Sequence, residues 1–206
     1  MRRFGGEVGY SLAALGLKRP EEGVLSGVRL GFLVGLGVLL VSFLVTPLVA
    51  MALNSLGYPP ENTAQQPLIQ GVRDYTSENP AVAIPAAVFV IVVLGPLVEE
   101  LVFRGALFGG LYRLGLLLAR RVVGYEKRSK TARWAALVPA ALFSSVIFAL
   151  LHGSPVIIPS IFILAVALCA LYQRTGSLLP SFLAHATFNS STTLLIVLSA
   201  FGVLPG

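Results

Sequence analysis

The stretch AVAIPAAVFVIVVLGPLVEELVFRGALFGGLYRLGLLL, residues 81–118, decides the fold class of this chain. It is apolar almost throughout, apart from the cluster of Glu99, Glu100 and Arg104, and it exceeds the roughly 20 residues that a transmembrane helix needs. An ionisable side chain in hydrocarbon costs about 2.5–3.5 kcal/mol on insertion scales. A membrane protein that keeps three of them together uses them for structure or for chemistry.

The composition extends the membrane assignment to the whole chain. Of its 206 residues, 56% are hydrophobic and 12% are charged, whereas soluble domains carry about 25% charged residues. We expect an all-α, polytopic transmembrane bundle of five to six membrane helices plus one short interfacial helix. Residues 1–23 are expected to form a cytoplasmic N-terminal segment, and residues 24–206 a single membrane domain.

The expected spans follow from the apolar segments and from the glycines and prolines between them. Gly95 and Pro96 are expected to kink the second span, and Gly105 to open the short interfacial helix, which ends near Val123. Gln173 to Ser177 is expected to form a turn, in which a glycine supplies the flexible position. The predicted spans are 24–53, a segment that starts near 81, 135–152, 161–172 and 183–203.

The charges outside these segments predict the orientation in the membrane. The segment 113–133 carries seven basic residues and one acidic residue, and the segment 1–29 carries five and three, whereas the loop 54–80 carries one and three. The positive-inside rule places the first two segments in the cytoplasm and the loop outside. The net charge of +6 needs no nucleic-acid partner, because anionic lipid head groups attract basic segments.

The first span carries small residues at a regular spacing. Gly27, Gly31 and Gly35 leave one helix face without side chains, so that another helix can approach closely. Packing within the chain is the favoured interpretation of this face. A homodimer formed through the same face is the alternative.

The charged cluster of the second span can be divided by its geometry. Glu100 and Arg104 are four residues apart, so on a helix they share a face and can form an ion pair. Glu99 is rotated by about 100° from Glu100 and can face a polar cavity, where a desolvated carboxylate acts as a general base on water. Structural pairing and ion translocation are the alternatives for Glu99.

The two histidines of the chain also lie in or beside apolar segments. His152 ends the third span, while His185 and Asn189 are four residues apart in the last one and can face one cavity. Each of them alone is typical of a hydrogen-bonded packing residue. Together, Glu and His to activate water and His and Asn to bind an oxyanion form a complete hydrolase set. A Glu/His/His trio is also a zinc ligand set, and spacing alone does not choose between the two.

Three motifs occur in order: E-E-L-V-F-R (Glu99 to Arg104), F-A-L-L-H (Phe148 to His152) and H-A-T-F-N (His185 to Asn189). They resemble the EExxxR, FxxxH and HxxxN motifs of the CAAX-protease and bacteriocin-processing family of intramembrane proteases, also called the ABI family. The similarity covers about residues 86–191, and the protease core is expected to span about 81–203.

The resemblance implies a helical membrane endopeptidase. By their match to the motifs, Glu99 would activate the hydrolytic water with the help of His152, and His185 and Asn189 would stabilise the oxyanion. The other motif residues would support the shape of the site; these are Glu100, Arg104 and Phe148. The family is usually described as metalloprotease, but a glutamate–histidine mechanism requires no zinc ligand set, so the cofactor stays open with zinc as its candidate.

The resemblance also frames the substrate and the alternatives. Eukaryotic members are described as trimming prenylated CAAX proteins, whereas the small size and the basic loop of this chain look more like a bacterial member in the cytoplasmic membrane. The expected substrate is a peptide or a membrane protein of unknown identity. The alternatives are a non-enzymatic membrane scaffold or bacteriocin-immunity protein on the same fold and, third, an ion-coupled transporter.

Overall fold

The computed structural model describes residues 15–58, 78–123 and 130–201, together with the separate positions 13, 71, 74, 75 and 203. Most of the N-terminal segment, the middle of the predicted outer loop and the centre of the predicted basic loop lie outside the described residues. All regular structure in the described part is helical. The predicted all-α class is therefore confirmed.

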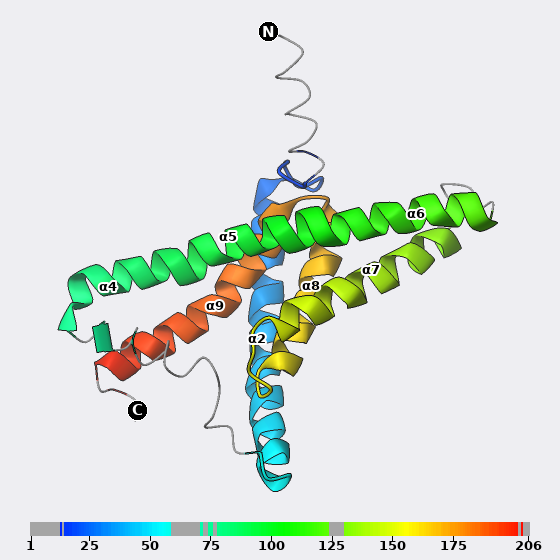
Figure 1. Cartoon of the computed structure of the whole chain (residues 1–206). Helices are drawn as coiled ribbons and strands as arrows, with labels where there is room; N and C mark the ends of the chain where they lie inside the picture. Colours follow the sequence, from blue (N-terminus) through cyan, green and yellow to red (C-terminus); the bar gives the residue numbers. More distant parts are fainter. Residues whose placement is uncertain are drawn as a thin grey trace.

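The segment that decides the fold class forms one continuous helix, which Figure 1 shows crossing the whole molecule. The residues that join its parts, among them Gly95 and Gly109, have right-handed helical dihedral angles. The separate short interfacial helix predicted from Gly105 is therefore wrong, and Gly95 and Pro96, where a kink was predicted, do not interrupt the helix. This long helix consists of α4 (Pro80–Ala87), the π-helix η1 (Val88–Leu94), α5 (Gly95–Glu100), the π-helix η2 (Leu101–Phe108) and α6 (Gly109–Val123).

The remaining helices lie on one side of the long helix or cross it (Figure 1). They are α2 (Val24–Ser55), α7 (Lys130–Leu150), α8 (Ile158–Thr175) and α9 (Leu178–Ala200). Within the described residues, four helices are long and apolar enough to cross a membrane: 24–55, 80–119, 130–150 and 158–175. The fifth predicted span corresponds to α9, which is not among the four and whose apolar run is interrupted by the HATFNSSTT segment, residues 185–193.

Helix α8 supplies the centre of the hydrophobic core. Its residues Leu164 and Leu168 are fully buried and belong to one cluster with Phe148 of α7 and Phe188 of α9. The helix ends at Gly176, whose φ of 61° lies in the left-handed region that glycine enters without steric cost. The predicted turn before the last helix is found at Gly176 and Ser177 and returns α9 along the core, whereas its predicted start at Gln173 is wrong because α8 continues to Thr175.

The small-residue face of α2, at Gly27, Gly31 and Gly35, packs against α9. A Cβ atom added to Gly31 would lie 2.5 Å from the carbonyl oxygen of Pro180, and one added to Gly35 would lie 2.5 Å from the carbonyl oxygen of Ala184. Packing within the chain is therefore confirmed. The alternative homodimer through this face is wrong, because the backbone of α9 already occupies it.

We expect Gly35→Ala to destabilise the protein and Gly37→Ala to stabilise it slightly. The added methyl group overlaps the backbone of α9 at Gly35 but meets nothing within 4 Å at Gly37. Overpacking typically costs about 1–3 kcal/mol, whereas alanine in place of glycine at an open helix position gains up to about 1 kcal/mol. Thermal unfolding in detergent measures both variants, and equal shifts would contradict the packing of α2 on α9.

Candidate active site

The first motif places a charged pair at the junction of α5 and η2. The side chain of Glu100 is 0% exposed and that of Arg104 is 1% exposed, and Arg104 Nη1 lies 3.2 Å from Glu100 Oε1. The ion pair predicted from the i, i+4 spacing is therefore confirmed. Breaking such a buried pair from one side is strongly destabilising, because the partner is left as an uncompensated charge.

His185 of α9 lies beside both glutamates of the first motif. Its Nδ1 donates a hydrogen bond of 3.0 Å to Glu100 Oε1, and its Nε2 lies 3.7 Å from Glu99 Oε2. A carboxylate only accepts, so the hydrogen of this bond is on Nδ1. The carboxylate of Glu100 thus joins Arg104 on its own helix to a histidine 85 residues further along the chain.

Phe148 of α7 brings the second motif to the first and the third. The guanidinium carbon of Arg104 lies 4.3 Å from the centroid of the Phe148 ring, so the buried cation also has an aromatic face as partner. The ring centroids of His185 and His152 lie 5.6 Å and 4.9 Å from that of Phe148. Phe148 itself is buried. The three motifs therefore meet around a single aromatic ring.

His152 lies just beyond the end of α7 and is half-buried. Its Nδ1 donates to the carbonyl oxygen of Phe148 at 2.8 Å. This bond defines the tautomer of the neutral ring, in which Nε2 is an acceptor. An imidazole held in this way can accept a hydrogen bond from a water molecule.

Asn189 makes a hydrogen bond to a backbone carbonyl of the long helix, and the sequence analysis did not predict this contact. Its Nδ2 donates to the carbonyl oxygen of Ile91 at 3.0 Å. In η1 the N–H of Gly95 bonds to the carbonyl of Val90, five residues earlier. The next N–H in this pattern would come from residue 96, but Pro96 has none. Asn189 therefore supplies the hydrogen bond that Pro96 cannot make, with one of its two amide hydrogens.

The cluster has unused capacity for hydrogen bonding. Buried polar atoms are usually paired. Within the part of the chain that the structure describes, the buried side-chain atoms without a hydrogen-bond partner all belong to the first motif: Glu99 Oε2, Glu100 Oε2, and Nε, Nη1 and Nη2 of Arg104. Arg104 Nη1 is close enough to Glu100 for an ion pair but is not aligned for a hydrogen bond. This is the place in the described chain that can take up further polar groups.

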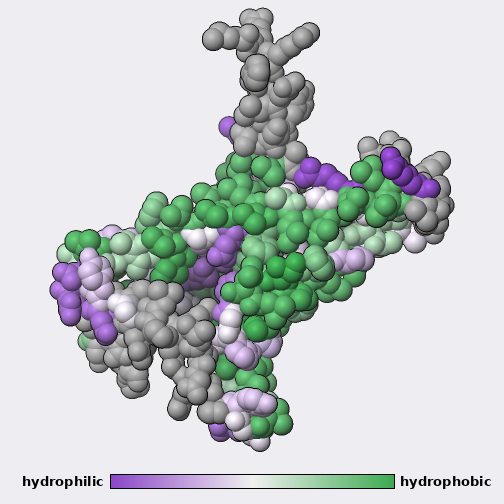
Figure 2. Space-filling model, in the orientation of Figure 1, coloured by the Kyte–Doolittle hydropathy of each residue, from purple (hydrophilic) through white to green (hydrophobic). Residues whose placement is uncertain are grey.

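Glu99 is the accessible member of the cluster. Its side chain is 36% exposed, whereas those of Glu100 and His185 are at most 2% exposed. Figure 2 shows hydrophilic surface in a recess between the long helix and α7, with hydrophobic surface above it and on either side. Two adjacent glutamates therefore have different surroundings, one closed and one open.

The donor set does not fit a zinc ion. Among the described residues, no three His, Cys, Asp or Glu side chains are arranged to hold a metal. Both ring nitrogens of His185 face carboxylate oxygens instead, at 3.0 Å and 3.7 Å. The charged cluster is therefore arranged for ion pairs and hydrogen bonds rather than for metal ligation.

Comparison with known proteins agrees with the arrangement of the motifs. A family model described as "Type II CAAX prenyl endopeptidase Rce1-like" matches residues 81–191, which is more than half of the chain and contains all three motifs. The chain belongs to the Rce1-like family. The Rce1-like assignment makes it a CAAX-type membrane protease by family, and its apolar helices make it an integral membrane protein. No curated protein and no solved structure gives a significant match.

We expect Glu100→Gln to destabilise this Rce1-like chain far more than Glu99→Gln. The two changes remove the same charge from adjacent positions, but Glu100 compensates Arg104 in a closed site and Glu99 is partly exposed. The expected losses are about 3–5 kcal/mol for Glu100→Gln and less than about 1 kcal/mol for Glu99→Gln. Thermal unfolding in detergent compares them, and equal melting temperatures would contradict the central role of Glu100.

We expect the stability effect of Asn189→Ala to depend on residue 96. In the native background the change leaves the carbonyl of Ile91 without a donor, at an expected cost of about 1–3 kcal/mol. Pro96→Ala restores a backbone N–H that can reach this carbonyl, so the same change should cost less in that background. A double-mutant cycle of unfolding free energies measures the coupling. Strict additivity would show that the two residues do not serve the same carbonyl.

Proposed function

We propose that this protein is an intramembrane endopeptidase that hydrolyses peptide bonds with water activated by Glu99. One observation carries the proposal: Glu99 is an accessible carboxylate 3.7 Å from His185 Nε2, while the other nitrogen of His185 is held by the buried Glu100. An open carboxylate beside a rigidly held imidazole gives a general base next to a group that donates a hydrogen bond from Nε2 when its ring is protonated. Peptide-bond hydrolysis requires both groups.

The first step uses Glu99 and His152. A water molecule donates one hydrogen bond to Glu99 and one to Nε2 of His152, whose tautomer is defined by the bond from Nδ1 to the carbonyl of Phe148. Glu99 takes a proton as the water oxygen bonds to the carbonyl carbon of the substrate. In the second step, the carbon–nitrogen bond breaks and Glu99 returns the proton to the leaving amine nitrogen. The products are a carboxylic acid and an amine, and Glu99 is regenerated.

The negative charge on the substrate oxygen is stabilised by His185 and Asn189. Protonated His185 donates from Nδ1 to Glu100 and from Nε2 to the oxyanion. The two carboxylates beside it compensate its charge. Asn189 contributes the amide hydrogen that does not bond to Ile91. Because that first bond orients the amide, the second hydrogen is preorganised, which is what effective oxyanion stabilisation requires.

Glu100, Arg104 and Phe148 act as positioning residues in this scheme. They are buried and contact each other or a histidine. Their contribution is to hold the imidazole of His185 in one orientation, since misplacement of a catalytic group by about 1 Å can cost 100-fold in rate.

The proposed substrate is a peptide or a membrane protein, cleaved in or near the bilayer. The proposed setting is the cytoplasmic membrane of a bacterium, with the N-terminus on the cytoplasmic side, as the distribution of basic residues predicts. On the same fold, a non-enzymatic scaffold or immunity protein is the competing function, and the following experiment distinguishes the two.

We expect Glu99→Gln to abolish cleavage while the protein stays folded. Loss of a general base lowers the rate about 10²–10⁴-fold. The measurement compares membrane and secreted peptides from cells with the native chain, with Glu99→Gln and with Glu78→Gln at matched expression; the last is a control that neutralises an exposed carboxylate on another segment. A precursor that accumulates only with Glu99→Gln is the expected result.

Two other outcomes would contradict the proposed protease. Cleavage that survives both Glu99→Gln and His152→Ala would exclude the proposed chemistry. A phenotype that persists in both variants, but is lost when Gly35→Ala displaces α9, would establish the scaffold function instead.

A further inference from the structure

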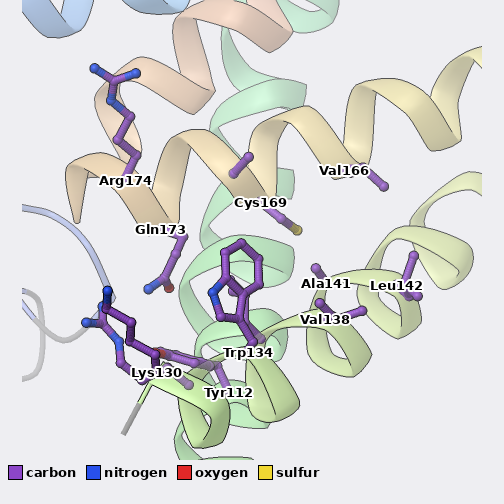
Figure 3. Close-up of a pocket in the computed structure, with 13 residues that line it drawn as sticks. Tyr112, Lys130, Trp134, Val138, Ala141, Leu142, Val166, Cys169, Gln173 and Arg174 are labelled. Carbon is purple, nitrogen blue, oxygen red and sulfur yellow. The ribbon is translucent and has the colours of Figure 1, made fainter. Parts of the chain in front are cut away.

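A cavity of about 800 Å³ lies between α6, α7 and α8, and none of the motif residues is among those that line it. Its volume is within the range of about 300–1,000 Å³ that is typical of small-molecule sites. Figure 3 shows the cavity from the side, with α8 above and α7 below. We refer to it as the α7–α8 groove.

One end of the groove is cationic. Figure 3 shows Lys130 and Gln173 there, and Gln173 has an amide that can donate. Arg133 also lines the groove and is three residues from Lys130 in the first turn of α7. Arg174 also lines the groove, but its guanidinium lies 3.5 Å from the carboxylate of Glu22 and is compensated by it. Among the described residues no ion pair is formed by Lys130 or Arg133. The end therefore offers two basic side chains and one amide to an anion.

The other end of the groove is apolar. Leu142 and Val166 lie there, far from Lys130 in Figure 3, and Trp134 lies between the two ends. Trp134 is 63% exposed and Leu142 is 45% exposed. Tryptophan beside basic residues is typical of the boundary between head groups and hydrocarbon. The groove therefore changes from cationic to apolar along its length, as a phospholipid changes from phosphate to acyl chain.

We propose that the α7–α8 groove binds one anionic phospholipid. Its phosphate lies between Lys130 and Arg133, and an acyl chain follows α7 and α8 past Trp134. Basic pockets between membrane helices on the cytoplasmic side bind anionic head groups. The segment 113–133 that leads into α7 is the one that its charge predicts to be cytoplasmic. A free phosphate would match only the cationic end, and an uncharged lipid would match only the apolar end.

The protein carries its own reporter for this lipid, because Trp134 is its only tryptophan. The full chain is reconstituted in phosphatidylcholine vesicles that contain rising fractions of phosphatidylglycerol with brominated acyl chains, which quench tryptophan on contact. A parallel series contains brominated phosphatidylcholine. We expect phosphatidylglycerol to reach half-maximal quenching at a mole fraction at least about fivefold lower than phosphatidylcholine does. The reason is that each basic side chain near the phosphate contributes about 1 kcal/mol.

Matched variants separate the groove from the general surface charge. Lys130→Gln with Arg133→Gln should remove the preference for phosphatidylglycerol. Arg29→Gln with Arg121→Gln removes the same charge from exposed positions that do not line the groove and should retain it. Ala170→Phe keeps every charge but fills the groove between Val166 and Gln173, and should weaken the preference as well.

Several results would overturn the proposal. Equal quenching by both lipids would exclude a site for an anionic head group. A preference lost equally in both double variants would reflect surface charge alone, and a preference unchanged by Ala170→Phe would place the acyl chain outside the groove. Inorganic phosphate that competes with the lipid at millimolar concentration would indicate a free-anion site. Quenching by both lipids that rises on protein dilution in the bilayer would indicate a second copy in the groove.

Discussion

The carboxylate of Glu100 is the constraint on which the rest of the site depends. It is completely buried, it pairs with Arg104 on its own helix, and it accepts a hydrogen bond from His185 on α9. A buried charge is tolerated only when its partners are placed well enough to offset the loss of hydration. The position of α9 relative to the long helix is therefore fixed by charge, and α7 is added through the ring of Phe148 on Arg104. The glycine face of α2 then fits against α9 from the other side.

This constraint explains why two adjacent glutamates can have different functions. Helical geometry rotates Glu99 by about 100° from Glu100, so Glu99 can stay 36% exposed while Glu100 is fully buried. The π turns on both sides of α5 affect the same residues, because they shift the helix register just before and just after the pair. Such π turns are rare and often occur at functional sites. The long helix is thus most irregular where its charges are.

Whether a contact of the fold or of the candidate site could be predicted depended on how far apart its two residues lie in the sequence. The pair of Glu100 and Arg104 follows from an i, i+4 spacing, and the turn at Gly176 and the packing face of α2 follow from local glycine patterns. The continuity of the long helix did not follow, because glycine is a local signal for the end of a helix and Gly105 was expected to open a separate one. The donor that compensates for Pro96, Asn189, is 98 residues from the carbonyl that it serves. The aromatic contact of Phe148 with Arg104 was missed for the same reason, since the two lie on different helices.

Helix α7 connects the α7–α8 groove to the charged cluster of the candidate active site. It has 21 residues, which gives a length of about 31 Å, close to the hydrocarbon thickness of about 30 Å. The basic end of the α7–α8 groove is at its first turn, and Phe148 is in its last turn. An anionic lipid held at Lys130 and Arg133 would therefore set the depth to which Phe148 and His152 enter the bilayer. Because Arg104 and His185 contact the Phe148 ring, that depth is also the depth of the charged cluster, where water must reach Glu99. Lipid binding at one end of α7 and water activation at the other are thus linked by the length of a single helix.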